Sequence, residues 1–250
     1  MTSLNFQARV PVFDANVGVG HRHDRVSPYS DANGVIEEMQ RHGVQKALIY
    51  HVQGEAISSI WANEALQEWD NDAFELQLCA GTGNDMLRQL AEYHASKRVK
   101  SVRLDSSPMR DGIPFVDWLY GPLLEWLSSE KIPLWVSLAD LSPVQIMDTL
   151  PKFPELVTVL VGAHYSHSAV LAPILGKLPN AVLELSRFEN LAGIEKLSKQ
   201  FGAKRLLYGS YFPRYAMGPM LYYLHHADID DKGLLAICAG NLERILQGEK

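Results

Sequence analysis

The sequence predicts an α/β fold, a single (β/α)8 TIM barrel that spans residues 1–250. Eight short apolar runs alternate with eight longer amphipathic segments along the chain. Strand–helix alternation at this spacing gives a parallel sheet. A chain of 250 residues suits one barrel domain, and no linker, internal repeat or low-complexity tract divides it.

The predicted strands are short, rich in Val, Leu, Ile or aromatic residues, and bounded by Gly, Pro, Asn, Asp or Ser. The first, sixth and eighth are nearly continuous apolar runs, as expected for parallel strands that are buried on both faces. The predicted strands are Val10–Asn16, Lys46–His51, Glu75–Ala80, Val99–Leu104, Ile132–Leu138, Val157–Ala163, Ala181–Ser186 and Arg205–Ser210.

Helical patterns fill the intervals between these strands. The fifth helix has the clearest start, because Ser142 can cap it, Pro143 suits its first position and Gln145 completes a capping box. The predicted helices are Asp31–His42, Ser58–Trp69, Asp85–Ser96, Phe115–Ser129, Pro143–Leu150, Ala169–Leu178, Leu191–Phe201 and Met217–His226.

An extra C-terminal helix, about Gly233–Leu246, follows without an intervening strand, and we expect it on the outside of the barrel. The five tryptophans lie mostly at helical spacing and are expected to pack helices against the strands: Trp61, Trp69, Trp118, Trp126 and Trp135. An open Rossmann-like sheet is the alternative fold. No Gly-x-Gly-x-x-Gly opens any helix, which argues against it.

Composition narrows the classes of partner. The net charge of −6 argues against a nucleic-acid surface but leaves small anionic substrates open. The two cysteines, Cys79 and Cys238, form no disulfide framework and favour a reducing compartment. No apolar run approaches the roughly 20 residues that span a bilayer, and the first ten residues do not resemble a signal peptide. We expect a cytoplasmic protein with no membrane partner, and a homo-oligomer remains open.

Barrel enzymes place their chemistry at the carboxyl ends of the strands and in the loops that follow. Polar side chains at those positions form the set of candidates. They are Asp14, Asn16, Gly18, His51, Arg103, Asp105, Ser137, Asp140, His164, His167, Glu184, Arg187, Tyr211 and Arg214.

Four stretches, in chain order, resemble the amidohydrolase-related family of metal-dependent hydrolases and decarboxylases. Val12–Gly18 (Val-Phe-Asp-Ala-Asn-Val-Gly) resembles its first strand, and Val161–His164 its sixth. Leu206–Pro213, with Gly-Ser-Tyr-Phe-Pro, resembles its eighth strand. Ala239–Leu246, with Asn-Leu-Glu-Arg-Ile-Leu, resembles its closing helix. The resemblance implies a barrel that acts on small molecules.

The chain departs from the family at the metal site. The family's first strand offers Asp-x-His-x-His, whose metal-binding positions are Asn16 and Gly18 here. Tyr211 replaces the strand-eight aspartate, Ser137 lies nearest to the strand-five histidine, and only His164 fits a family histidine. A transition metal needs about three or four N, O or S ligands. We therefore expect no metal and no other cofactor.

A displaced divalent metal is an alternative. His21 and His23 repeat a His-x-His spacing a few residues late and could combine with His164 or His51. The simpler interpretation is a solvated polar loop, because two histidines in a loop fix no coordination geometry.

His164 and His51 are the candidate catalytic residues, because an imidazole at a barrel mouth titrates near neutrality and can serve as acid or base. Either could instead be a structural, hydrogen-bonded histidine. Arg103 and Arg187 are the candidate anion-binding residues, since a guanidinium offers a fork for carboxylate or phosphate. Each could instead pair with a neighbour, Arg103 with Asp105 and Arg187 with Glu184 or Glu189.

Strand parity adds an expectation, because residues two apart share a face. Arg103 and Asp105 should point the same way, as should Asp14, Asn16 and Gly18. Asn16, Asp105 and Tyr211 join the arginines as candidate substrate-binding residues, and Asp14 is interpreted as structural.

Three functions follow. The first is a metal-free hydrolase of a small, carboxylated molecule, with His164 as acid or base, Asn16 and Tyr211 orienting the substrate, and an arginine holding its anion. Cleavage of a C–C bond is a less favoured reaction. The second is an inactive barrel that binds a metabolite or protein partner. The third is an enzyme with the displaced metal at His21 and His23.

Overall fold

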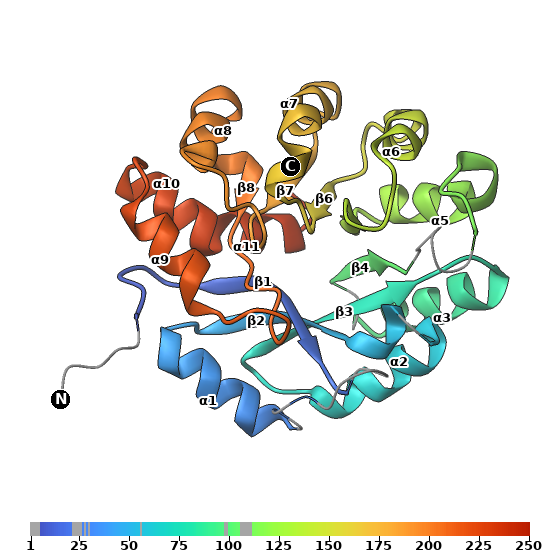
Figure 1. Ribbon diagram of the computed structural model, residues 1–250. Helices are drawn as coiled ribbons and strands as arrows, with labels where there is room; N and C mark the ends of the chain where they lie inside the picture. Colours follow the sequence, from blue (N-terminus) through green and yellow to red (C-terminus); the bar gives the residue numbers. More distant parts are fainter. Residues whose placement is uncertain are drawn as a thin grey trace.

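The structure, a computed structural model, describes residues 6–21, 27, 29, 31–55, 57–97, 100–105 and 112–250. Eight parallel strands form one sheet in chain order (Figure 1). They are β1 (Phe13–Val19), β2 (Lys46–His51), β3 (Phe74–Ala80), β4 (Ser101–Leu104), β5 (Leu134–Ser137), β6 (Thr158–Val161), β7 (Ala181–Glu184) and β8 (Leu206–Leu207).

The sheet closes into a ring between its first and last strands. The amide of Ala15 donates to the carbonyl of Tyr208 at 3.1 Å, and the amide of Gly18 to that of Phe212 at 2.6 Å. A parallel bridge pairs Val17 with Phe212. The predicted barrel is confirmed, and the open-sheet alternative is wrong.

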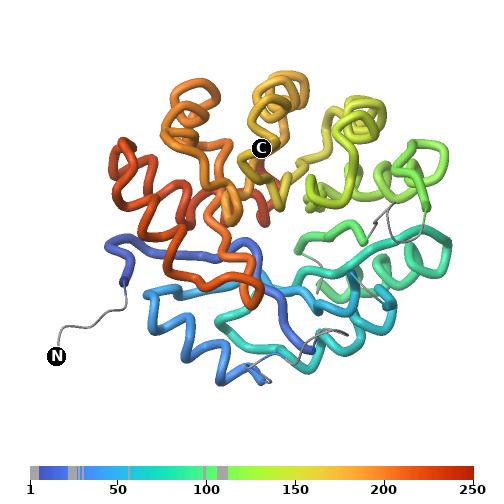
Figure 2. Tube along the Cα trace, in the orientation of Figure 1, coloured from blue at the N-terminus to red at the C-terminus, as the bar shows by residue number. Residues whose placement is uncertain are grey.

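The helices surround the ring of strands, as the chain trace shows in Figure 2. The predicted cap of the fifth helix is present, because the Val144 amide donates to the Ser142 hydroxyl. The helices are α1 (Ala32–His42), α2 (Ser59–Leu66), α3 (Asn84–Ala95), α5 (Asp117–Ser129), α6 (Pro143–Thr149), α7 (Ser168–Lys177), α8 (Gly193–Phe201), α9 (Gly218–His226), α10 (Asp231–Leu235) and α11 (Asn241–Leu246). Within the described ranges, none is long and apolar enough to cross a bilayer.

The two largest apolar clusters among the described residues hold the fold together. The larger lies between strands and helices. The smaller lies inside the barrel and consists of Phe13, Ala15, Leu48, Trp135, Val159, Val161, Val182, Leu207, Ala239, Leu242 and Ile245. Because its last three members come from the C-terminal segment, this segment covers the lower opening of the barrel, at the amino ends of the strands.

This position corrects the expectation that the last helix lies on the outside. The Asn241 amide group donates to the carbonyls of Ala203 and Leu206 at 2.8 Å, beside the start of β8. The amide of Tyr208 donates to the carbonyl of Ile237. An open barrel would expose its lower apolar layer to water, and Leu242 and Ile245 remove that layer from solvent.

The tryptophan expectation is wrong for two residues. Trp135 points into the barrel from β5, and its indole nitrogen donates to the carbonyl of Ala15 at 3.2 Å. Trp118 is 75% exposed, so it buries little surface against the strands, whereas Trp61, 47% exposed, packs against His51 of β2.

The expectation that the side chains of Asp14 and Asn16 point the same way from β1 also fails. The pairing of β1 with β2 shifts register between Asp14 and Val17. Such a bulge lets two consecutive residues face the same side. Ala15 packs inside the barrel, and the side chain of Asn16 also points inward, to Glu184 and Arg103. Asp14 instead accepts from the backbone amides of Asn16 and Ser210.

Candidate functional site

A polar layer lies above the apolar cluster inside the barrel, toward the carboxyl ends of the strands. Three of its members come two residues after an interior apolar residue: Tyr50 after Leu48, Ser137 after Trp135, and Glu184 after Val182. Alternation along each strand therefore turns these side chains inward. Asn16 and Arg103 complete the layer, and it forms the floor of the barrel mouth.

Arg103 is the centre of this layer and is only 2% exposed. Its Nε donates to Glu55 Oε1 at 3.0 Å, and its Nη1 donates to Asn16 Oδ1 at 3.2 Å. The guanidinium lies 4.0 Å from the centre of the Tyr50 ring. Its second terminal nitrogen, Nη2, is buried without a hydrogen-bond partner among the described residues. The buried Arg103 guanidinium can therefore still donate a hydrogen bond from Nη2.

The alternative pairing of Arg103 with Asp105 is not the one formed. Asp105 Oδ2 accepts from the Ser59 hydroxyl at 2.6 Å, on the side of helix α2. Glu55, in the turn after β2, is the actual partner, and it also accepts from Arg214 at 2.7 Å. Two guanidinium groups thus share one carboxylate.

Asn16 connects Arg103 to a second buried group. Its Nδ2 donates to Glu184 Oε2 at 3.0 Å, and the Ser186 amide and hydroxyl donate to the same carboxyl group. Burial raises the pKa of Glu184 to about 7, although these hydrogen bonds act to lower it. Burial also raises the pKa of Asp14 to about 6, although hydrogen bonds from Ser210 and Asn16 act to lower it. At Gly209, an added Cβ would lie 2.1 Å from Glu184 Oε1, so glycine makes room for this carboxyl group.

The implied metal can be tested against these contacts. Asn16 Oδ1, a weak neutral ligand, already accepts from a guanidinium cation. A divalent ion there would lie beside that positive charge in a poorly solvated place. At Gly18, a Cβ would lie 2.6 Å from Val52, so no larger ligand side chain fits. Of the described residues, no three His, Cys, Asp or Glu are grouped closely enough to hold a metal. These residues do not fit the family's metal.

The displaced metal site falls only partly within the described chain. His23 lies outside the described residues. His21 Nδ1 accepts from the Ser27 amide at 3.1 Å, so that nitrogen is already engaged.

The two candidate catalytic histidines occupy different surroundings. His51 is buried against Trp61, and its Nδ1 has no partner among the described residues. Burial, followed by His21, lowers its pKa, so it is neutral at neutral pH. His164 is half-buried just after β6, with Nδ1 3.4 Å from the Ser166 hydroxyl. Its ring lies against Tyr165.

Tyr211 lies close to the arginines, as expected for a mouth residue. Its ring centre is 4.7 Å from the Arg214 guanidinium and 5.9 Å from that of Arg103. Burial, followed by Glu55, raises its pKa to about 12, so its hydroxyl keeps its proton. Arg187 lies 5.9 Å from the Tyr215 ring and, among the described residues, pairs with neither Glu184 nor Glu189.

The structure therefore joins part of the predicted site. Asn16, Arg103 and Tyr211 form one cluster. No hydrogen bond or ring contact links His164 to Asn16 or Tyr211, all three being within the described residues. Sequence reasoning missed Tyr50 and Glu55. Alternation from Leu48 could have identified Tyr50, whereas Glu55 is 48 residues from its partner Arg103 and carries no pattern.

No protein-family model and no curated protein matches this sequence. Solved structures do match. 2,6-Dihydroxybenzoate decarboxylase complexed with 2,6-dihydroxybenzoate superposes with a TM-score of 0.76 at 12% identity, covering 97% of this chain and 99% of that one. Amidohydrolase 2 from Bifidobacterium longum subsp. infantis gives 0.68 at 15%, covering 96% and 100%.

A probable 2-pyrone-4,6-dicarboxylic acid hydrolase from Acinetobacter baumannii gives a TM-score of 0.63 at 14% identity, covering 95% of this chain and all, 100%, of that chain. Identities this low show the fold alone. The chain therefore has the barrel fold of amidohydrolase-type proteins, as the resemblance of its strands implied.

Proposed function

We propose that this protein is an enzyme that hydrolyses a small carboxylated molecule at the barrel mouth without a transition metal. The observation that carries the proposal is Arg103, a buried guanidinium whose Nη2 has no hydrogen-bond partner among the described residues. A buried donor without an acceptor costs about 1–3 kcal/mol, more when it is charged. A substrate carboxylate would supply the acceptor and offset that cost.

Asn16 and Glu184 act here as positioning residues. Both polar atoms of the Asn16 side chain are engaged, one by Arg103 and one by Glu184. In the proposal, Asn16 therefore fixes the guanidinium plane and does not contact the substrate, which revises its expected role. Tyr50 covers one face of the guanidinium and limits the approach of water.

The hydrolytic step uses two further groups. The Tyr211 hydroxyl has a pKa of about 12 and is therefore protonated. It donates a hydrogen bond to the substrate carbonyl oxygen as negative charge develops there. His164 removes a proton from water, water oxygen bonds to the carbonyl carbon, and His164 returns the proton as the bond to the leaving oxygen or nitrogen breaks.

The structural relatives support the substrate class. Their names specify a dihydroxybenzoate decarboxylase and a probable hydrolase of a pyrone dicarboxylic acid. Both names refer to small carboxylated molecules. Decarboxylation remains the second reaction to test, because the same arginine would hold a carboxylate in either case.

A binding protein without catalysis is the alternative. One observation favours it: His164 Nδ1 lies 3.4 Å from the hydroxyl of Ser166, and among the described residues no hydrogen bond or ring contact ties this histidine to the arginine cluster. A barrel that binds a carboxylate at Arg103 needs no acid or base there.

The test is a panel of lactones, amides and carboxylated aromatic acids, assayed for binding and turnover in chelator-treated protein. Arg103→Met should weaken binding about 100-fold, because a buried charge pair with the ligand is lost. His164→Ala should abolish turnover but retain binding. Arg88→Met and His226→Ala, both at exposed positions, are the matched controls.

Turnover that survives His164→Ala would remove this histidine from the mechanism. Tight binding without turnover of any compound would favour the binding protein. Activity that disappears with the chelator and returns with zinc would contradict the metal-free proposal.

A further inference from the structure

A cavity lies at the opposite end of the barrel from the mouth. It has a volume of about 240 Å³ and lies between the amino ends of β6 to β8 and helix α11. Its apolar lining includes Val157, Val182, Phe201 and Ile245. Its charged lining consists of Lys204, Arg205, Arg244 and Lys250.

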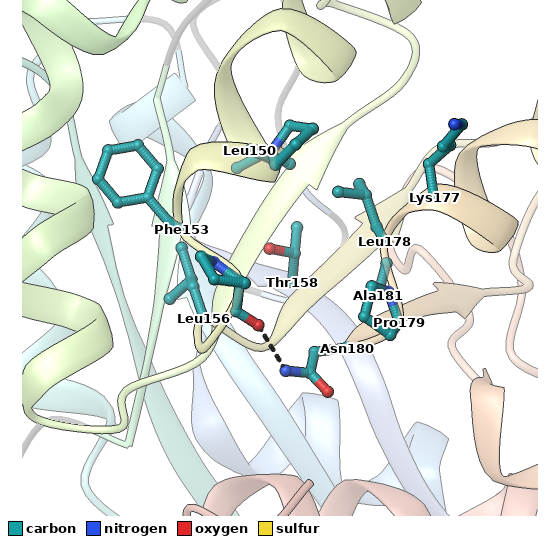
Figure 3. Close-up of a pocket in the computed structure, with 11 residues that line it drawn as sticks. Leu150, Phe153, Leu156, Thr158, Lys177, Leu178, Pro179, Asn180 and Ala181 are labelled. Carbon is teal, nitrogen blue, oxygen red and sulfur yellow. Dashed lines mark hydrogen bonds between the residues drawn. The ribbon is translucent and has the colours of Figure 1, made fainter.

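The floor of this cavity is part of the core. Val182 and Ile245 belong to the cluster inside the barrel, so a ligand there would contact apolar surface. A smaller hollow of about 60 Å³ adjoins it (Figure 3) and shares Pro179 and Asn180. The Asn180 amide donates to the carbonyl of Pro154 at 2.7 Å; Figure 3 marks this hydrogen bond by a dashed line from Asn180. This bond fixes the wall between the two spaces.

The guanidinium groups in the larger cavity are held by neutral partners. Arg205 donates to the carbonyls of Leu175, Leu178 and Ala181. Arg244 donates to the carbonyls of Lys204 and Glu249. Over the described part of the chain, neither arginine forms an ion pair, and Lys250 is the one lining cation that does, with Glu155.

The balance of charge among the cavity-lining side chains therefore favours binding of an anion. The C-terminal end of α7 carries a partial negative charge that offsets part of the charge of Arg205. Arg244 likewise lies in the last turn of α11 and donates to the carbonyl of Glu249, so part of its charge is offset too. The described residues that line the cavity include no carboxylate side chain, and Lys204 is exposed. The whole chain has a net charge of −6, so the positive charge around this cavity is a local feature that the overall composition does not explain.

We propose that this cavity is a second ligand site, separate from the mouth, which binds a small organic anion with an apolar body, such as a medium-chain carboxylate. The apolar end lies against Val182 and Ile245, and the carboxylate lies between Lys204 and Arg244. A structural role explains why Arg205 and Arg244 tie strands and helices together. It does not explain a cavity left open between cationic side chains.

The experiment uses hexanoate as the probe and methyl NMR on the whole protein, so that the two ends of the barrel report separately. The methyl groups of Ile245 and Val157 report the lower cavity, and those of Val52, beside Tyr50, report the mouth. Hexanoate should shift Ile245 and Val157 in a saturable manner. Lys204→Glu should weaken this binding about tenfold or more, because an attractive charge becomes repulsive.

Lys199→Glu is the matched control, since it makes the same charge change at an exposed position of α8 outside the cavity lining. It should leave the hexanoate affinity unchanged. Thermal unfolding of both variants checks that the fold persists.

Shifts confined to Val52, no saturable shift at millimolar hexanoate, or equal affinities of the Lys204→Glu and Lys199→Glu variants would each overturn the proposal. Inorganic phosphate provides the last comparison. Binding of phosphate as tightly as hexanoate would overturn the assigned apolar body of the ligand.

Discussion

The upper and lower halves of the barrel interior are built from the same strands, yet they differ in chemistry. The lower half is apolar, includes the fully buried Trp135, and is closed by helix α11. The upper half carries Asn16, Arg103 and Glu184. Alternation separates the two layers by only two residues along a strand.

Hydrogen-bond satisfaction differs in the same way. In the lower layer, the single polar group of Trp135 has its acceptor at Ala15. In the upper layer, Arg103 Nη2 and Ser137 Oγ have no partner among the described residues. Most buried polar groups in folded proteins are paired, so such a concentration of unpaired atoms indicates a place where a ligand or water binds. We infer that the apolar lower half stabilises the fold and that the polar upper half binds a ligand.

The largest expected effect tests the lower half. Trp135→Ala removes a fully buried indole and leaves a cavity, so the free energy of unfolding should fall by about 3–5 kcal/mol. Trp118→Ala, at an exposed position, should change it by less than about 0.5 kcal/mol. Denaturant unfolding of both variants measures the difference. Equal effects would show that the barrel interior does not carry the stability assigned to it.

An intermediate effect tests the space around Glu184. Gly209→Ala would place a Cβ 2.1 Å from Glu184 Oε1, and moving this carboxyl group breaks its bonds to Asn16 and Ser186. The unfolding free energy should fall by about 1–3 kcal/mol. Gly176→Ala, in helix α7 with open space around it, should instead stabilise by about 0.5–1 kcal/mol. Stability shifts of the same sign would contradict the close packing at Glu184.

A third effect is a pH dependence of stability at Asp14. Burial raises its pKa from 3.8 to about 6, so the folded state holds this proton more tightly than the unfolded state. Stability from this group is present at low pH and is lost as the pH rises from about 4 to 6. Asp14→Asn removes the titration and keeps an oxygen for the amides of Asn16 and Ser210.

The Asp14→Asn variant should therefore gain stability relative to the parent protein as the pH rises from about 4 to 6. Above about pH 6, the stability difference between the two proteins should stay constant. Thermal unfolding at a series of pH values measures this difference. A stability difference between the two proteins that does not change with pH would contradict the raised pKa.

Much of the fold could be predicted because each strand is an apolar run that ends at a turn residue. The position of α11 could not, since the pattern of Leu242 and Ile245 specifies an apolar face but not the surface that it covers. The bulge between Asp14 and Val17 depends on pairing with neighbouring strands, which a single segment does not reveal.

The candidate site could be predicted only in part, for the same reason. Strand-end positions predicted Asn16, Arg103 and Tyr211 as candidates, and the structure brings these three side chains together. The partner of Arg103 is Glu55, which the closure of the barrel brings near from a different βα turn. Local spacing suggested Asp105 instead, whose carboxylate is bound by Ser59.

The most direct test of the account is a crystal structure with bound benzoate, with anomalous data collected above the zinc absorption edge. The account predicts a benzoate oxygen within hydrogen-bond distance of Arg103 Nη2 and no metal peak at the mouth. A metal ion coordinated by His164 and Asn16, or benzoate bound away from Arg103, would contradict it.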